Sequence, residues 1–87
     1  MPRSERGELV RLHREVVRSR LKANAMRQEM IQALGDWLCG CGSPPALDEL
    51  KALAALCQAQ EAAEARYGRY VAALSEAVVA RAQRTES

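Results

Sequence analysis

The chain has 87 residues and a formal net charge of +2, and 48% of its residues are hydrophobic. Sixteen of those hydrophobic residues are alanine, phenylalanine is absent and there is a single tryptophan, so large core side chains are scarce. Chains this short bury only about 60% of their unfolded surface. The composition excludes a second domain and favours one domain, 1–87, that completes its core by associating with itself or with another protein.

The first ten residues, MPRSERGELV, are charged from the third position and lack the apolar core of a secretory signal. No uninterrupted apolar run is long enough to cross a bilayer. We therefore expect a cytoplasmic location, where the three cysteines stay as reduced thiols.

The first predicted helix covers about 4–39. Its apolar residues recur at alternating steps of three and four, which is the pattern of a heptad seam. The seam consists of Leu9, Leu12, Val16, Ser19, Ala23, Met26, Met30, Ala33 and Trp37. A second row repeats every seven residues beside it and consists of Val10, Val17, Asn24, Ile31 and Leu38. Together they form an apolar stripe wider than one partner helix covers.

Glycine and proline gather in the stretch LCGCGSPPALDE, residues 38–49, and predict a turn at about 40–43. Gly40 or Gly42 supplies the left-handed residue that ends the first helix. Ser43 followed by Pro44 is typical of a helix cap and first helical residue, so the second helix is predicted at about 44–84. A linker this short makes the two helices antiparallel neighbours.

The second helix is rich in alanine and carries its own seam. This seam consists of Leu50, Leu53, Cys57, Gln60, Glu64, Tyr67, Val71, Leu74 and Val78, flanked by Leu56, Ala63, Tyr70 and Ala77. Folding the chain at the turn places position i opposite about 85 minus i. The predicted fold is an all-α, coiled-coil-like antiparallel two-helix hairpin that completes a four-helix bundle by dimerisation or hetero-association. Gly68 is either a tolerated weak point in this helix or the mark of a close helix crossing.

Neither a catalytic set nor a metal site is expected. Cys39 and Cys41 are close together, but Cys57 and His13 lie far along the two helices, so four ligands do not meet within one chain. The sequence has no nucleophile elbow, phosphate-binding loop or metalloprotease motif. We expect no enzyme activity, no cofactor and no small-molecule substrate, and we read 38–49 as a plain connection. Whether Cys39 and Cys41 form a redox pair stays open.

A basic face follows the first helix. Arg11, Arg14, Arg18 and Lys22 recur at steps of three and four, so they share one side. Such a face is either simply solvated, or it binds an acidic protein surface, nucleic acid or an anionic lipid surface. No recognition-helix motif supports nucleic acid.

The large apolar side chains near the turn form the second candidate site. Methionine adapts its shape and tryptophan is frequent at binding hot spots. The predicted binding residues are Met26, Met30, Ile31, Leu34, Trp37 and Leu38, together with Tyr67 and Tyr70. These residues either form only the core of the hairpin or also bind a protein partner. The predicted function is a small adaptor, assembly factor or co-chaperone that packs its helices against a partner, and the alternative is a nucleic-acid-binding regulator that uses the basic face.

Overall fold

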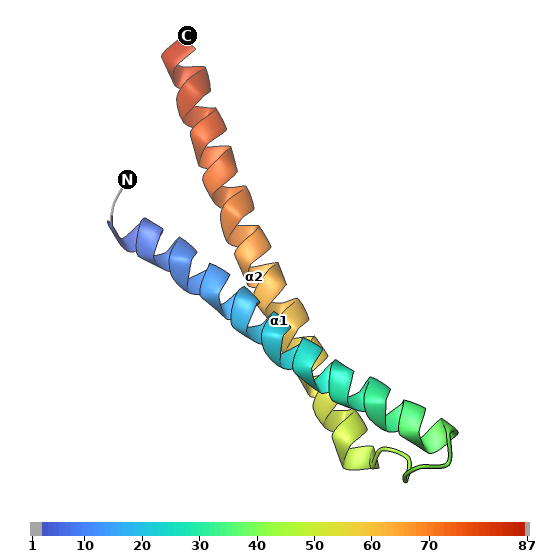
Figure 1. Cartoon of the computed structure of the whole chain (residues 1–87). Coiled ribbons are helices and arrows are strands. Elements are labelled where there is room, and N and C mark those ends of the chain that lie inside the picture. The colour runs from blue at the N-terminus through green and yellow to red at the C-terminus, as the bar shows by residue number, and fades with distance from the viewer. Residues whose placement is uncertain (1–2, 87) are drawn as a thin grey trace.

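The computed structural model describes residues 3–86, with side chains over 5–85, and contains two helices in this part of the chain. Helix α1 spans Arg3–Leu38 and helix α2 spans Leu47–Glu86. The linker 39–46 joins the two helices, which run antiparallel and pack against each other (Figure 1). The prediction of an all-α helical hairpin is therefore confirmed.

Helix α1 ends at Leu38 and is terminated by a turn at Gly40. The amide of Gly40 donates to the carbonyl of Trp37 at 3.0 Å, and the amide of Cys41 donates to the carbonyl of Asp36 at 2.8 Å. This pair of bonds is the Schellman motif, which needs a left-handed residue just past the helix. Gly40 adopts that conformation, with φ of 77°. Of the two candidate glycines, Gly40 ends the helix.

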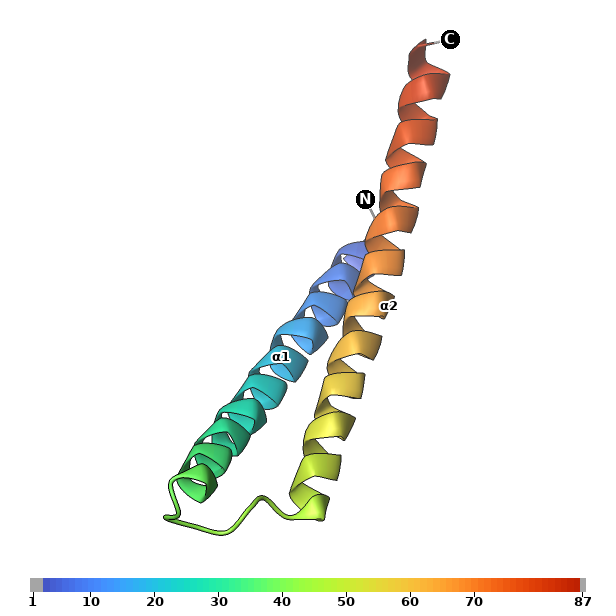
Figure 2. The same ribbon diagram turned by 90° about the vertical axis from the view of Figure 1, so that its right-hand side faces the viewer.

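Helix α2 begins three residues later than predicted, at Leu47. A proline disfavours helical dihedrals at the residue before it, so Pro44 keeps Ser43 extended and Pro45 does the same to Pro44. The first turn instead starts at Ala46, whose carbonyl accepts from the amides of Glu49 and Leu50, both at 3.1 Å. Ser43 is therefore not the residue that caps α2. Two adjacent prolines lengthen the linker and widen the turn end of the hairpin (Figure 2).

The core of the hairpin is small. Its buried residues on α1 run from Leu12 to Met30, on either side of the point where the two helices cross (Figure 1). Ala23 and Ala63 are 0% and 2% exposed, and these small side chains let the helix backbones approach closely. The buried residues among those described are Leu12, Val16, Ala23, Met30 and Ala63. Four of the five belong to the predicted seam of the first helix. The buried side of α2 is centred on Ala63, which was expected beside the seam rather than in it.

The predicted register is confirmed near the crossing and is wrong at the open end. Arg20 was expected opposite residue 65, and its Nε donates to Oε1 of Glu64 at 2.8 Å. Toward the chain ends the pairing shifts: the hydroxyl of Tyr70 donates to the carbonyl of Glu5 at 3.2 Å, ten residues from the expected partner. The shift follows from the crossing, because helices that cross at an angle do not keep the constant register of a coiled coil.

The resulting molecule is an extended rod of 70 × 22 × 15 Å with a radius of gyration of 20.1 Å. A compact domain of this length has a radius of gyration of about 12 Å. The hairpin therefore leaves much of its surface uncovered. In the part of the chain that the structure describes, neither helix contains a stretch long and apolar enough to span a membrane.

Candidate functional site

The turn end of the hairpin carries a cluster of exposed apolar side chains. We call it the turn-end cluster; its members are Ile31, Leu34, Trp37, Leu38, Leu47 and Leu50. Each is between 40% and 78% exposed, although all are large hydrophobic residues. They come from the last two turns of α1 and the first turn of α2, on either side of the wide linker (Figure 2). Because the helices separate here, neither covers the other.

The structure distributes the predicted apolar binding residues over two environments. Ile31, Leu34, Trp37 and Leu38 lie in the turn-end cluster. Met30 is only 4% exposed and belongs to the core of the hairpin, and Met26 is half-buried beside it. Tyr67 and Tyr70 lie in the interhelical contact, away from the turn-end cluster.

Tyr67 and Tyr70 hold α2 against the first half of α1. The ring of Tyr67 lies 5.6 Å from the ring of His13, tilted by 53°, and places the only histidine at the edge of the helix contact. The hydroxyl of Tyr70 bonds to the backbone of Glu5, and partial burial of the ring together with the nearby carboxylates of Glu5 and Glu8 raises the pKa of its phenol. Both side chains are half-buried. Both therefore take part in the interhelical contact of the hairpin.

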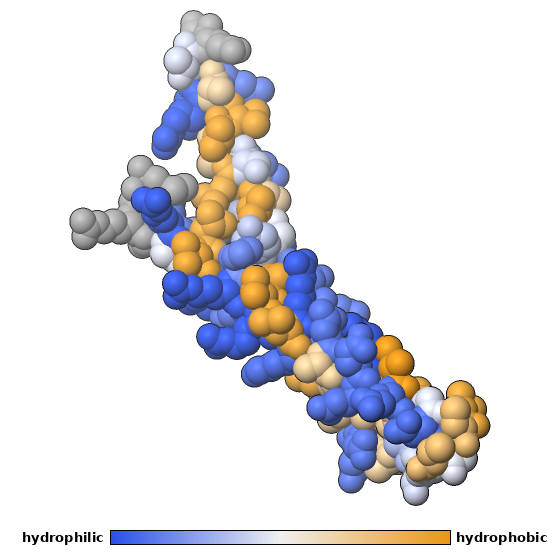
Figure 3. Space-filling view, viewed as in Figure 1, coloured by the Kyte–Doolittle hydropathy of each residue, from blue (hydrophilic) through white to orange (hydrophobic). Residues whose placement is uncertain are grey.

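The open end of the hairpin has a second uncovered apolar surface, which the sequence reasoning did not select. A groove of about 520 Å³ lies where α2 separates from α1. Its walls are formed by Leu9, Tyr67, Val71, Leu74, Ser75, Val78 and Val79. Figure 3 shows this apolar surface on the upper arm of α2, with further apolar surface over α1 and at the turn. The periodicity assigned Val71, Leu74 and Val78 to the seam. The divergence of the helices leaves Val71 and Val78 exposed and Leu74 half-buried.

The apolar row at seven-residue intervals on α1 lies beside the interhelical contact, next to Arg20 and Arg27. We call it the outer row; it consists of Val10, Val17, Asn24, Ile31 and Leu38. Residues three or four apart are neighbours on a helix, so Asn24 adjoins Arg20 and Arg27. Arg20 contacts Glu64 and Arg27 contacts Cys57, the latter with Nη2 3.4 Å from Sγ. The outer row therefore borders this side of the interhelical contact and is not covered by α2.

Near the start of α1 the basic face adjoins the outer row, because Val10 lines the same pocket as Arg11, Arg14 and Arg18. Further along α1, the basic face borders the other edge of the interhelical contact. There Nη2 of Arg66 pairs with Oε2 of Glu15 at 3.4 Å, and a shallow groove runs between Arg18 and Lys22 of α1 and Ala59 of α2. The interhelical contact therefore separates the basic face from the outer row only in part, since Arg14 is four residues from Val10 and three from Val17.

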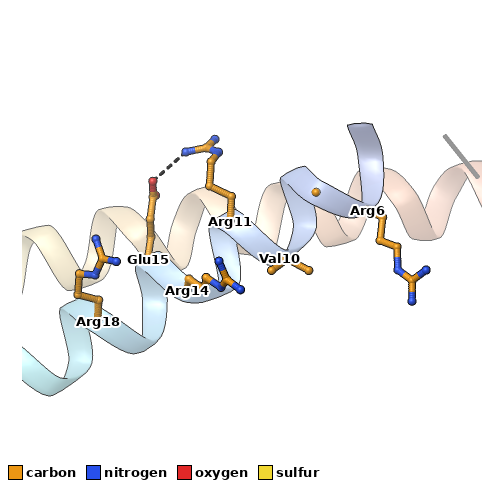
Figure 4. Close-up of a pocket in the computed structure, with 7 residues that line it drawn as sticks. Arg6, Val10, Arg11, Arg14, Glu15 and Arg18 are labelled. Atoms are coloured by element: carbon orange, nitrogen blue, oxygen red, sulfur yellow. Dashed lines mark hydrogen bonds and ion pairs between the residues drawn. The ribbon is translucent and has the colours of Figure 1, made fainter. Parts of the chain in front are cut away.

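Arg11 is already neutralised within its own helix. It forms ion pairs with Glu8 and with Glu15, the second at 2.8 Å (Figure 4). Its hydrogen bond to Glu8 lowers the pKa of that carboxyl and raises the pKa of the guanidinium.

Among residues 5–85, Arg14, Arg18 and Lys22 have no ion-pair partner. In Figure 4 the side chains of Arg6, Arg14 and Arg18 spread along α1 without converging on one point. These cations, together with Val10 and Arg11, line an open pocket of about 590 Å³ and are spread along it.

The cysteines do not assemble a metal site. Cys39 and Cys41 are exposed in the turn, where Sγ of Cys41 lies 3.7 Å from the carbonyl oxygen of Cys39. Cys57 is half-buried on α2 beside Arg27. Within the residues that the structure describes, no three of the histidine, cysteine and acidic side chains gather closely enough to hold a metal ion.

No family model, curated protein sequence or solved structure matches this chain. The arrangement itself defines an all-helical hairpin with one small core, two uncovered apolar ends and a basic face that adjoins the outer row near the start of α1. Such a surface is suited to helix packing against another protein, because large apolar side chains presented by rigid helices are the usual anchors of protein interfaces.

Proposed function

We propose that this chain is a non-enzymatic protein-binding module that packs its two helices against a partner and completes a helical bundle with it. Its expected role is that of a small cytoplasmic adaptor, assembly factor or co-chaperone. The supporting observation is the turn-end cluster, where six large apolar residues at one end of the hairpin are exposed. Contiguous apolar patches of this kind on a small chain mark interaction sites.

Trp37 is the sharpest probe of this proposal. It is 46% exposed, so a charge at this position can stay in water without entering the core of the hairpin. Met30 is a poor probe, because a charge there would be buried and would unfold the hairpin whatever its function. We expect Trp37→Glu to keep the helical circular dichroism signal and to lose association.

The matched control is Ala65→Glu, which adds the same charge at an exposed position in the middle of α2. Light scattering coupled to size exclusion should give a mass above 9.6 kDa for the unmodified chain or for its complex with a co-purifying protein. Ala65→Glu should keep that mass and Trp37→Glu should lose it. A chain that stays at 9.6 kDa at every concentration and recovers no stoichiometric protein partner from cell extract would contradict the proposal.

Nucleic-acid binding through the basic face is the alternative. It rests on the exposed side chains of Arg14, Arg18 and Lys22, which have no ion pair within residues 5–85, whereas Arg11 is engaged by Glu8 and Glu15. This reading predicts binding that weakens steeply as salt is added, by about one counterion for each phosphate contacted. Binding would fail in the variant Arg14→Glu/Arg18→Glu, which leaves the turn-end cluster intact.

A further inference from the structure

The area that the hairpin leaves uncovered is large enough for a stable interface. The accessible surface of the chain is 6857 Å². A compact monomer of 9.6 kDa exposes about 5,100 Å², so the excess is about 1,800 Å². A standard protein interface buries only about 800 Å² on each partner. The excess is therefore larger than the area that one partner contributes to such an interface.

The outer row has a pattern that is symmetric about Asn24. Val17 and Ile31 lie seven residues to either side of it, and Val10 and Leu38 lie fourteen residues to either side. These four aliphatic side chains are 41–78% exposed. If a second α1 lies antiparallel on this row with Asn24 on the twofold axis, Val17 faces Ile31 and Val10 faces Leu38. Every aliphatic residue of the row then meets another, as an isologous interface requires.

Asn24 has the chemistry that an axial position needs. Its Oδ1 accepts from Nη1 of Arg27 at 2.7 Å, and within residues 5–85 its amide nitrogen has no acceptor. Two such side chains on a twofold axis can donate to each other. A single polar asparagine in an apolar helix interface fixes the register, because any shift buries its amide against aliphatic side chains.

Charge favours the antiparallel over the parallel arrangement. The first part of α1, residues 3–24, has seven basic and three acidic residues, which gives +4. The remainder, residues 25–38, has one basic and two acidic residues, which gives −1. An antiparallel pair places +4 beside −1, whereas a parallel pair places +4 beside +4. Like-charge juxtaposition suppresses the second pairing.

The antiparallel arrangement also brings unlike ends together. The turn-end cluster of one copy comes to lie beside the open end of the other, where Leu9, Val71 and Val78 line the uncovered groove. Both ends of each hairpin are apolar and uncovered for the same reason, the divergence of the helices from their crossing (Figure 1). In the dimer, the uncovered apolar turn end of each copy therefore lies beside the uncovered apolar open end of the other.

We propose that the partner is a second copy of this chain, bound antiparallel along the outer row with the two Asn24 side chains paired on the twofold axis. This inference rests on the proposed function and specifies its partner. The product is a four-helix bundle in which Val10, Val17, Ile31 and Leu38 of both copies form a new core.

Disulfide trapping tests the axis directly. The full chain is prepared with its native thiols removed (Cys39→Ser, Cys41→Ser, Cys57→Ala), and single cysteines are added one at a time. A disulfide needs Cα atoms within about 7 Å, a condition that only a residue on the axis meets with its own copy. Under a mild oxidant, Asn24→Cys should form a covalent dimer much faster than Lys22→Cys, the exposed control on the basic face. Equal rates would overturn the inference.

Mixed trapping tests the direction. Val17→Cys mixed with Ile31→Cys should give the mixed disulfide in preference to either homodisulfide. Preferred homodisulfides at both positions would mean a parallel dimer and would overturn the inference.

A second test uses no cysteine. Val17→Glu and Ile31→Lys should each weaken the dimer by about tenfold or more in sedimentation, since each places two like charges, one from each copy, in the new core. The double variant Val17→Glu/Ile31→Lys should recover dimerisation, because each glutamate then faces the lysine of the other copy. Failure of this rescue would contradict the pairing.

The outcomes also separate this inference from the proposed function. An unmodified chain that is monomeric alone, but binds a different protein through Trp37, overturns self-association and leaves the proposed function standing. Absence of both kinds of complex overturns both.

Discussion

Replacing Gly40 by alanine should destabilise the hairpin, whereas the same change at Gly42 should not. The two glycines are two residues apart in one linker and are both exposed, so the pair is a matched comparison. Gly40 has φ of 77° and Gly42 has no positive φ. A Cβ added at Gly40 meets no atom within 4 Å, and one added at Gly42 meets only Cβ of Asp36 at 3.8 Å, an ordinary contact. The backbone conformation, not crowding, therefore decides the difference.

The magnitude follows from two opposing effects. An L-residue in the left-handed conformation costs about 1–2 kcal/mol. Alanine also lowers the entropy of the unfolded chain, which stabilises the fold by about 0.4–1 kcal/mol where the native dihedrals suit it. Gly40→Ala combines both effects and should lose up to about 1.5 kcal/mol, while Gly42→Ala has only the second and should gain a few tenths. The two variants should differ by about 1.5 kcal/mol, or about 6–12 °C in melting temperature for a domain of this size.

Urea and thermal unfolding followed by circular dichroism at 222 nm measure this difference. Both variants and the unmodified chain are compared at one protein concentration, because association makes the melting temperature depend on concentration. Equal melting temperatures for the two variants would refute the reasoning. A larger loss for Gly42→Ala would show that the helix ends at Gly42 instead.

Two further predictions concern α2. The hydrogen bonds of Glu64 with Arg20 and then Gln60 lower its pKa, so its contribution to stability is present above the ordinary carboxyl value of 4.5 and is lost as the pH falls below it. Glu64→Gln should flatten the acid side of a plot of unfolding free energy against pH. Glu61→Gln, the control at an exposed position of the same helix, should leave it unchanged. Indistinguishable curves for the two variants would contradict the Arg20–Glu64 contact. Gly68→Ala should stabilise the chain by about 0.5–1 kcal/mol, because helical glycine is unfavourable and a Cβ at this position meets nothing within 4 Å. Destabilisation, measured by urea unfolding, would show that another chain packs closely at residue 68.

The helices and their connection were predictable because their causes are local. Helical periodicity and the absence of breakers mark both long segments, and glycine at the end of the first marks its stop. The start of α2 was misplaced because Ser43 and Pro44 match a capping pattern that the second proline, Pro45, cancels. For Gly68 the sequence left two interpretations open, a tolerated weak point or a close helix crossing. The structure places the crossing near Ala23 and Ala63 instead, and a Cβ at Gly68 would meet nothing within 4 Å.

The candidate site was only partly predictable because exposure depends on the angle between the helices. The sequence identified Ile31, Trp37 and Leu38 as apolar residues in excess of what one helix covers, and all three are exposed. It grouped Met30 with them, although Met30 lies close enough to the crossing to be buried. The exposure of Leu47 and Val78 was not predicted. A constant register would have kept the open end, and Val78 with it, covered. A helix that started at residue 44 would have placed Leu47 inside its first turn.

The same feature that makes the core of this hairpin tight also makes it short. Alanines at the crossing bring the helix backbones together, and from that point the gap between two straight crossed helices grows steadily toward both ends. The apolar seams nevertheless continue past the region of contact, to Trp37 on α1 and to Val78 on α2, both of which are exposed. Beyond the region of contact, these apolar seam residues have no helix packed against them. Burying those side chains against a further helix would add about 25 cal/mol for each Å² covered, which is a large gain for so small a core.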